Sequence, residues 1–196
     1  MNLGHPLSSL ITTLSGQVLE VLVNTSDPLS GRHVMRLVRR DASQQGVQNA
    51  LDELAAQGLV EQTSAGGSIL NTLNRDHILA PYIIGIVNLR KDLINRIAAI
   101  ISEEAPEVRR AILFGSLARG SADEESDIDI AMIWPDEESE ETTEEDIAVR
   151  VDNLTGNACN LLHYTAEEFD TLAERAPELY AAFESEGIDL IGALAR

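Results

Sequence analysis

The chain has little lysine, little cysteine and few aromatic residues. Lys91 is the only lysine and Cys159 the only cysteine among 196 residues. A single cysteine excludes an internal disulfide framework and a cysteine-based zinc site. No run of eighteen apolar residues occurs, and no basic segment precedes an apolar stretch at the N-terminus. We therefore expect a cytoplasmic protein that does not span a membrane.

Basic residues are scarce, and the resulting acidic excess is uneven. The formal net charge is −19, with five arginines against seven acidic residues in 1–80 and nine basic against twenty-six acidic residues in 81–196. Eight of the eleven residues in Asp136–Asp146 are acidic, which is typical of a solvated segment. A lysine-poor, acid-rich surface suits a salt-loving host, although a GC-rich genome also lowers lysine content.

One segment carries the residues most informative about function. An apolar strand predicted over Val108–Phe114 leads into a Gly115–Ser116 turn and a short helix, where free backbone N–H groups favour a phosphate. Asp127 and Asp129 follow in a second predicted strand, and their spacing of two places both on one face. Magnesium binds one or two such carboxylates and takes phosphate oxygens as further ligands. The segment therefore predicts a site for a nucleoside triphosphate with magnesium.

At these residues the chain resembles the nucleotidyltransferase superfamily of the DNA polymerase beta type, particularly its minimal members. The resemblance covers residues 106–192. It implies a mixed sheet flanked by helices, and transfer of a nucleoside monophosphate from ATP or another triphosphate to a hydroxyl acceptor. The residues that it implies are Gly115, Ser116 and Arg119 for the nucleotide, and Asp127 and Asp129 for two Mg²⁺ ions.

The resemblance is incomplete at one position. Active relatives carry a third carboxylate on a later strand, and the matching residue here is Asn160. An amide brings no negative charge and cannot act as a base. Asp152 is the nearest other carboxylate, but we expect it on the preceding helix. Asn160 thus joins Asp127 and Asp129 in the predicted catalytic set, and two hypotheses stay open: an active enzyme, or a regulator that binds nucleotide without turnover.

Residues 1–75 are predicted to form a winged helix-turn-helix domain. Helices are expected over Leu7–Val23, Gly31–Val38 and Gln44–Gln57, followed by a hairpin over residues 59–73. The phrase LDELAAQGLVE resembles the third helix and first wing strand of that family. The candidate DNA-binding residues are Arg36, Arg39, Arg40, Gln44, Gln45 and Gln48. Because the third helix has no basic residue, DNA binding and a protein-contact role both stay open.

The predicted fold class is α+β, in three parts: the winged helix domain at 1–75, a long linking helix at 76–104 and a minimal nucleotidyltransferase domain at 105–196. The linking helix is expected over Asp76–Glu103, with an apolar stripe and any early interruption near Pro81. We also expect a homodimer. Minimal family members resemble the antitoxin half of toxin–antitoxin pairs, and this analogy implies a HEPN-type protein partner and operator DNA.

Overall fold

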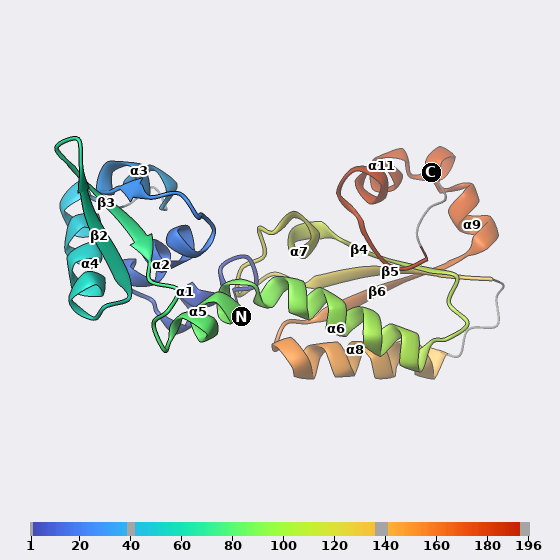
Figure 1. The fold of residues 1–196 in the computed structure, drawn as a ribbon. Helices are drawn as coiled ribbons and strands as arrows, with labels where there is room; N and C mark the ends of the chain where they lie inside the picture. Colours follow the sequence, from blue (N-terminus) through green and yellow to red (C-terminus); the bar gives the residue numbers. More distant parts are fainter. Residues whose placement is uncertain (1, 39–41, 136–140, 193–196) are drawn as a thin grey trace. The chain divides into compact units, whose positions relative to one another are not determined.

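A computed structural model describes residues 2–38, 42–135 and 141–192. The chain divides into a C-terminal unit, made of Met1–Gly4 with Arg90–Arg196, and an N-terminal unit, His5–Leu89 (Figure 1). Of the predicted features, Arg39, Arg40 and residues 136–140 of the acidic run lie outside the described residues. Across the described ranges, no helix combines the length and the apolar character that crossing a bilayer requires.

The C-terminal unit is built on a mixed four-stranded sheet in the order β6-β5-β4-β7. β4 (Arg110–Phe114) pairs antiparallel with β5 (Ile128–Trp134) and with β7 (Ile188–Ile191), whereas β6 (Cys159–Thr165) runs parallel to β5. Helix α8 (Glu141–Thr155) joins the parallel pair, because parallel strands need a long crossover connection. This sheet confirms the predicted fold class for this half of the chain.

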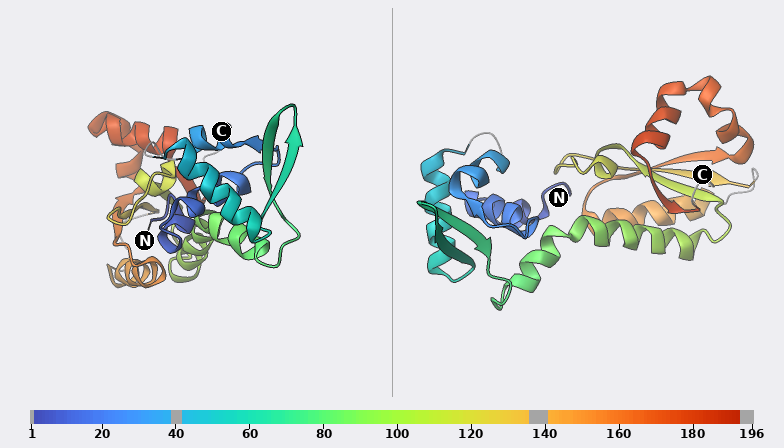
Figure 2. Two further views of the ribbon diagram at one scale, coloured as in Figure 1. Left: turned by 90° about the vertical axis from the view of Figure 1, so that its left-hand side faces the viewer. Right: turned by 45° about the horizontal axis from the view of Figure 1, so that its top comes forward.

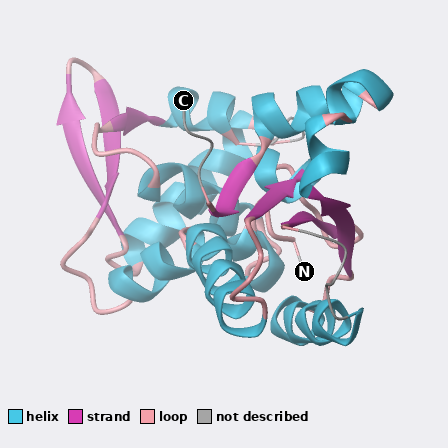
Figure 3. Cartoon of the chain, turned by 90° about the vertical axis from the view of Figure 1, so that its right-hand side faces the viewer, coloured by secondary structure: helices cyan, strands magenta, loops and turns pink. Residues whose placement is uncertain are grey.

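Helices cover both faces of the sheet, as Figures 1, 2 and 3 show. The further helices of this unit are α6 (Leu89–Glu104), α7 (Gly115–Arg119), α9 (Ala166–Asp170), α10 (Leu172–Arg175) and α11 (Pro177–Glu186). Ile128 and Ile130 of β5 are buried against α6 and α8, whereas Ala131 and Ile133 are buried against α9–α11. Since side chains alternate along a strand, Asp129 lies on the α9–α11 face.

The N-terminal unit pairs its helices with a three-stranded sheet in the order β1-β3-β2. Its elements are α1 (Pro6–Leu10), α2 (Leu14–Val23), β1 (Leu29–Ser30), α3 (Gly31–Leu37), α4 (Gln44–Ala56), β2 (Val60–Ala65), β3 (Ser68–Leu73) and α5 (Ala80–Val87). Ser30 caps α3, because its side chain accepts a hydrogen bond from the backbone N–H of His33. The first predicted helix is instead divided into α1 and α2, where Gly16 packs against the carbonyl of Ile11 too closely for a side chain.

The stretch predicted as one linking helix forms two helices, α5 and α6. Helix α5 begins at Ala80 because Pro81 lacks a backbone N–H and fits only the first turn. It ends at Val87, with Asn88 as its C-cap, after a run of β-branched residues and a glycine that are poor helix formers. The boundary between the two units falls here, so α5 belongs to the N-terminal unit and α6, from Arg90, to the C-terminal unit.

Candidate functional site

Asp127, Asp129 and Asn160 meet where β5 and β6 begin. The parallel ladder sets Asp129 opposite Asn160, and the Asn160 Nδ2 lies 3.2 Å from Asp127 Oδ2 and 3.2 Å from Asp129 Oδ1. A side-chain amide has two N–H groups, so it can donate one to each carboxylate. The three residues that the sequence predicted as a catalytic set are therefore in contact.

The two carboxylates converge on one point, and this arrangement fits a divalent cation. Among the described residues, no cluster of three or more His, Cys, Asp or Glu side chains suited to a metal occurs, so the site offers two carboxylates and an amide. Mg²⁺ is commonly held by one or two carboxylates and completes its shell with water and phosphate oxygens. Asp127 and Asp129 are the residues that would hold it.

Gly115 lies directly against Asp129. Its φ is +73°, and a Cβ at this position would be 2.5 Å from Asp129 Oδ2. The preceding residue, Phe114, is the register partner of Asp129 in the β4–β5 ladder. Only glycine satisfies both the left-handed conformation and the close approach. The predicted turn and the predicted carboxylate pair are therefore parts of one site.

Helix α7, which begins at Gly115, is held at its C-terminal end by Arg90. The Arg90 guanidinium donates to the carbonyls of Leu117 and Ala118, the former at 2.8 Å from Nε. Gly120 ends the helix with φ +75°. Arg90 was not predicted from the sequence, because it lies 27 residues before Leu117 and only the fold brings them together.

The other two residues predicted for the nucleotide have contacts of their own. Ser116 is partly exposed, and its carbonyl accepts from the backbone N–H of Ser121 at 2.9 Å. Arg119 Nη1 donates to Glu186 Oε2 at 2.8 Å across an exposed surface. Before Arg119 could contact a phosphate, its side chain would have to break this ion pair with Glu186 of α11.

Asn157 is a further residue that positions the site, and the sequence did not single it out. It is buried, and its Nδ2 donates to the Ser126 carbonyl at 2.9 Å. It also contacts the Asp123 carbonyl at 3.4 Å. These bonds tie the loop before Asp127 to the turn that precedes β6. The spacing of the carboxylates from Asn160 therefore depends on a buried amide three residues earlier.

Cys159 and Asp152 stand beside the site without joining the carboxylate pair. Asp152, on α8 as expected, accepts from the backbone N–H of Cys159 at 2.6 Å. Burial, together with the charges of Asp152 and Asp129, raises the pKa of the Cys159 thiol to about 12. The thiol is therefore neutral at physiological pH and is not a nucleophile there.

His163 and Trp134 lie at the opposite end of the β5–β6 pair from the carboxylates. Glu144 Oε1 accepts from Trp134 Nε1 at 2.8 Å and lies 2.8 Å from His163 Nδ1. Trp134 is buried in the core, with 5 % of its surface exposed. These contacts to Glu144 of α8 give both residues a structural role on the α8 side of the sheet.

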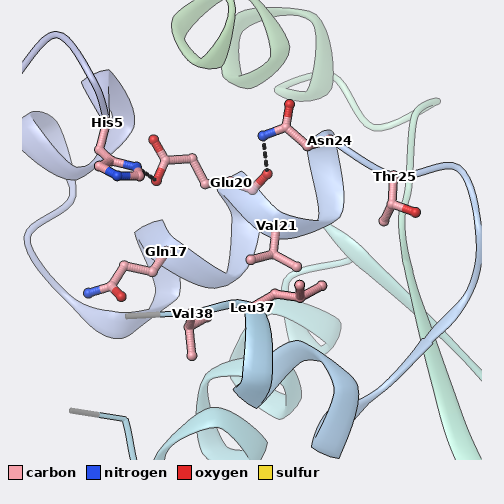
Figure 4. A pocket seen from close by; sticks show the side chains of 8 residues that line it. All are labelled: His5, Gln17, Glu20, Val21, Asn24, Thr25, Leu37 and Val38. Carbon is pink, nitrogen blue, oxygen red and sulfur yellow. Dashed lines mark hydrogen bonds and ion pairs between the residues drawn. The ribbon is translucent and has the colours of Figure 1, made fainter. Parts of the chain in front are cut away.

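Each unit of the chain contains at least one cavity. One of about 700 Å³ adjoins the site, and its lining includes Phe114, Gly115 and Arg119 together with residues of α11. The other, of about 350 Å³, lies in the N-terminal unit and is drawn in Figure 4. There the carboxylate of Glu20 points to His5, whose Nδ1 lies 3.2 Å from it.

Of the candidate DNA-binding residues that the structure describes, Arg36 lies on α3, and Gln44, Gln45 and Gln48 lie on α4. Gln44 and Gln48 line a cavity of about 420 Å³ with Arg32. The amides of α4 are paired within the helix, since Gln45 Nε2 donates to an asparagine at 2.8 Å and Gln48 Nε2 donates to Asp52 at 2.9 Å. Arg36 is exposed on α3.

Residues 95–177 match the model of the family described as "Polymerase beta, Nucleotidyltransferase". The match spans the Gly115 turn, the Asp127–Asp129 pair and Asn160. The matched residues lie within the C-terminal unit, whose mixed sheet flanked by helices has the nucleotidyltransferase fold. A search of curated proteins found no match to the chain.

Several solved structures are similar to this chain at low identity. A toxin–antitoxin complex with AMP-PNP has a chain that is 22 % identical, with a TM-score of 0.40, covering 52 % of this chain and 74 % of its own. A structure of the tri-AMPylated HEPN toxin from Shewanella oneidensis in complex with MNT antitoxin has a chain that is 19 % identical, with a TM-score of 0.37. That match covers 53 % of this chain and 73 % of the other chain. TrmBL2, an archaeal chromatin protein, is 13 % identical, with a TM-score of 0.32. That match covers 92 % of this chain and 78 % of the other chain.

Proposed function

We propose that the C-terminal domain is a magnesium-dependent nucleotidyltransferase that transfers a nucleoside monophosphate, AMP from ATP, to a hydroxyl on a protein or RNA acceptor. One observation carries this proposal: Asp127 and Asp129 converge beside the Gly115 turn within a domain that matches the family. Bound divalent cations would supply Lewis-acid charge to the triphosphate and to the acceptor.

The residues of the chain have separate roles in this proposal. Asp127 and Asp129 hold the cations, and Gly115 leaves room for the Asp129 carboxylate while the turn it forms with Ser116 receives the triphosphate. Arg119 can exchange its exposed contact with Glu186 for a phosphate. Asn160 orients the carboxylates but cannot take a proton from the acceptor, so we expect slow turnover.

Radiolabel transfer tests the proposal. The full chain is incubated with α-labelled ATP, MgCl₂ and the proteins and RNA that co-purify with it, and labelled acceptors are separated on a denaturing gel. Asp127→Asn and Asp129→Asn should abolish transfer, whereas Asp170→Asn, an exposed change of the same charge on α9, should not. Absence of transfer by the wild type and by Asn160→Asp would contradict the catalytic function.

A second candidate function is a regulator that binds nucleotide without turnover, and Asn160 in place of a carboxylate favours it. In this proposal the N-terminal unit is a winged helix that binds operator DNA. Arg36 would contact phosphates, and Gln44, Gln45 and Gln48 would read base edges. Gln45 and Gln48 would first have to release their present hydrogen bonds to neighbouring side chains of α4. Arg39 and Arg40, which lie outside the described residues, stay in the proposal on their sequence position alone.

Band-shift titrations on the promoter of the protein's own gene test the DNA proposal. Gln48→Ala should reduce the preference for promoter over unrelated DNA, while Arg36→Ala should weaken binding to both and make the salt dependence shallower. Gln17→Ala, a matched amide on α2, serves as the control. Equal binding to all sequences by wild type and variants would favour the protein-contact role instead.

The partner in these proposals is a HEPN-type protein encoded beside this chain. This chain would act as the antitoxin of that protein. We also propose that this chain forms a homodimer. A gene for a small all-helical protein next to this one would support the pairing. Light scattering of the purified chain, alone and with that protein, measures both assemblies. A monomer that forms no complex would contradict both.

A further inference from the structure

The cavity of about 700 Å³ beside Gly115 lies on the same face of the sheet as the carboxylate pair. Phe114 lines it and is the register partner of Asp129. Directly opposed residues of an antiparallel pair have neighbouring side chains on one face. The cavity and the predicted triphosphate site also share Gly115 and Arg119. The two are therefore continuous.

The walls of this cavity suit a flat, largely apolar group. Its lining residues are Phe114, Gly115, Arg119, Ala176, Pro177, Glu178, Leu179 and Ala182. The Phe114 ring is fixed by an edge-to-face contact with Phe183, with ring centroids 4.9 Å apart. A fixed aromatic ring offers a surface on which a nucleobase can stack. The charged lining residues, Arg119 and Glu178, are exposed.

The cavity lies on the β4 side of Asp129, away from Asn160. In the strand order β6-β5-β4, Asn160 on β6 and Phe114 on β4 flank Asp129 from opposite sides. The acceptor is expected on the Asn160 side, where the family's third carboxylate would stand. This leaves the side of Gly115 and α11 for the rest of the nucleotide.

We propose that this cavity binds the nucleobase and ribose of the nucleotide whose phosphates contact the Gly115 turn and the Asp127–Asp129 pair. The proposal rests on the proposed nucleotide-binding function of the domain. It adds that helix α11, which lies far along the chain from Gly115 and the Asp127–Asp129 pair, contributes to the nucleoside subsite through Leu179 and Ala182.

Calorimetric titration of the full chain with Mg·ATP and with Mg·tripolyphosphate tests this. ATP should bind about tenfold more tightly or better, because stacking of a base buries apolar surface that tripolyphosphate lacks. Ala182→Trp, which fills the cavity, should remove that advantage and leave tripolyphosphate binding unchanged. Ala181→Trp is the matched control, because Ala181 is the exposed neighbour on the same helix.

Photolabelling of the wild type with 8-azido-ATP gives a readout that does not depend on any variant. Label on the peptide 176–182 would support the proposal, and label confined to other segments would overturn it. Equal affinity for ATP and tripolyphosphate, or an ATP advantage that survives in a folded Ala182→Trp, would overturn the nucleoside subsite while leaving the phosphate site in place. Failure of both ligands to bind would overturn the subsite and the proposed function together.

Discussion

Asn160 holds two like-charged groups together by donating to both. Its amide nitrogen stands between the Asp127 and Asp129 carboxylates, where a cation would otherwise reduce their repulsion. The amide therefore stabilises the metal-free site, and it also lowers the negative charge available to a metal compared with a third carboxylate. A carboxylate at this position would therefore destabilise the metal-free site and strengthen the binding of a metal.

Asn160→Asp should make the metal-free protein less stable and its response to magnesium larger. The change removes both donated hydrogen bonds and adds a third like charge, at a cost of about 1–3 kcal/mol. Thermal unfolding in EDTA and in excess MgCl₂ measures both effects. Asn153→Asp, which adds the same charge at an exposed position of α8, should show neither. An Asn160→Asp protein that magnesium stabilises no more than the wild type would contradict this account.

Gly115→Ala should weaken cation binding. A Cβ would displace the Asp129 carboxylate from its place 2.5 Å away, and the left-handed backbone adds strain of about 1–2 kcal/mol. Titration with Mn²⁺, followed by electron paramagnetic resonance, measures the loss. Gly85→Ala is the control: it lies within α5 with open space around it, so it should leave binding intact and stabilise the helix by about 0.5–1 kcal/mol. Equal Mn²⁺ binding by both variants would contradict the prediction.

Cys159 should resist alkylation in the folded protein. Its raised pKa of about 12, caused first by burial, keeps the thiol protonated at pH 8.5, whereas an unfolded thiol has a pKa near 9.0. Iodoacetamide labelling followed by mass spectrometry should be slow in buffer and fast in urea. The folded state binds this proton more tightly, so its contribution to stability is complete below pH 9 and is lost as the pH rises towards 12. Rapid labelling of the folded chain would contradict the buried, neutral thiol.

At the scale of elements, the ion pair between Arg110 and Asp189 links β4 to the edge strand β7. Arg110 Nε donates to Asp189 Oδ1 at 2.7 Å, and its guanidinium carbon lies 5.5 Å from the centre of the Phe169 ring. The Arg110 side chain is 11 % exposed, and its Nη1 is buried without a partner among the described residues. The charge of this buried guanidinium is therefore compensated by the Asp189 carboxylate, and its burial is unfavourable without that partner.

Asp189→Asn should therefore destabilise the C-terminal unit by about 1–3 kcal/mol, less than for a fully buried pair because Asp189 is 32 % exposed. Urea denaturation measures the free energy of unfolding. Glu186→Gln breaks the exposed pair with Arg119 and should cost less than about 1 kcal/mol. Equal losses in the two variants would show that burial of Arg110 has no such effect.

The local elements of the site could be predicted because their signals are local. The apolar run before Gly115 and the alternation around Asp129 each depend on a few adjacent residues, and β4, α7 and β5 formed within two residues of the predicted ranges. Asn160 lies 31 residues from Asp129, and it was predicted only because the resemblance to the nucleotidyltransferase superfamily places a third carboxylate at this position. Arg90 and Asn157 were not predictable, because their partners lie 27 and 31 residues away and only the tertiary fold brings them near.

At the scale of the whole molecule, the dominant property is the net charge of −19. The excess is concentrated after residue 80, in the segment that forms most of the C-terminal unit. Six ion pairs were found among the described residues, two of which involve histidine, so most carboxylates have no basic partner there. Self-repulsion of this size opposes the folded state unless counterions screen it.

Added salt should therefore stabilise the full chain. Thermal unfolding followed by circular dichroism should give a melting temperature that rises from dilute buffer to about 0.5 M NaCl, where the screening length is already only about 4–5 Å. A rise that levels off there indicates screening alone. A rise that continues into molar salt would add exclusion of salt from the protein surface and would support a salt-loving host. Sucrose, which is excluded but carries no charge, separates the two contributions. A melting temperature that is constant or falls with salt would show that repulsion among the acidic residues does not limit stability.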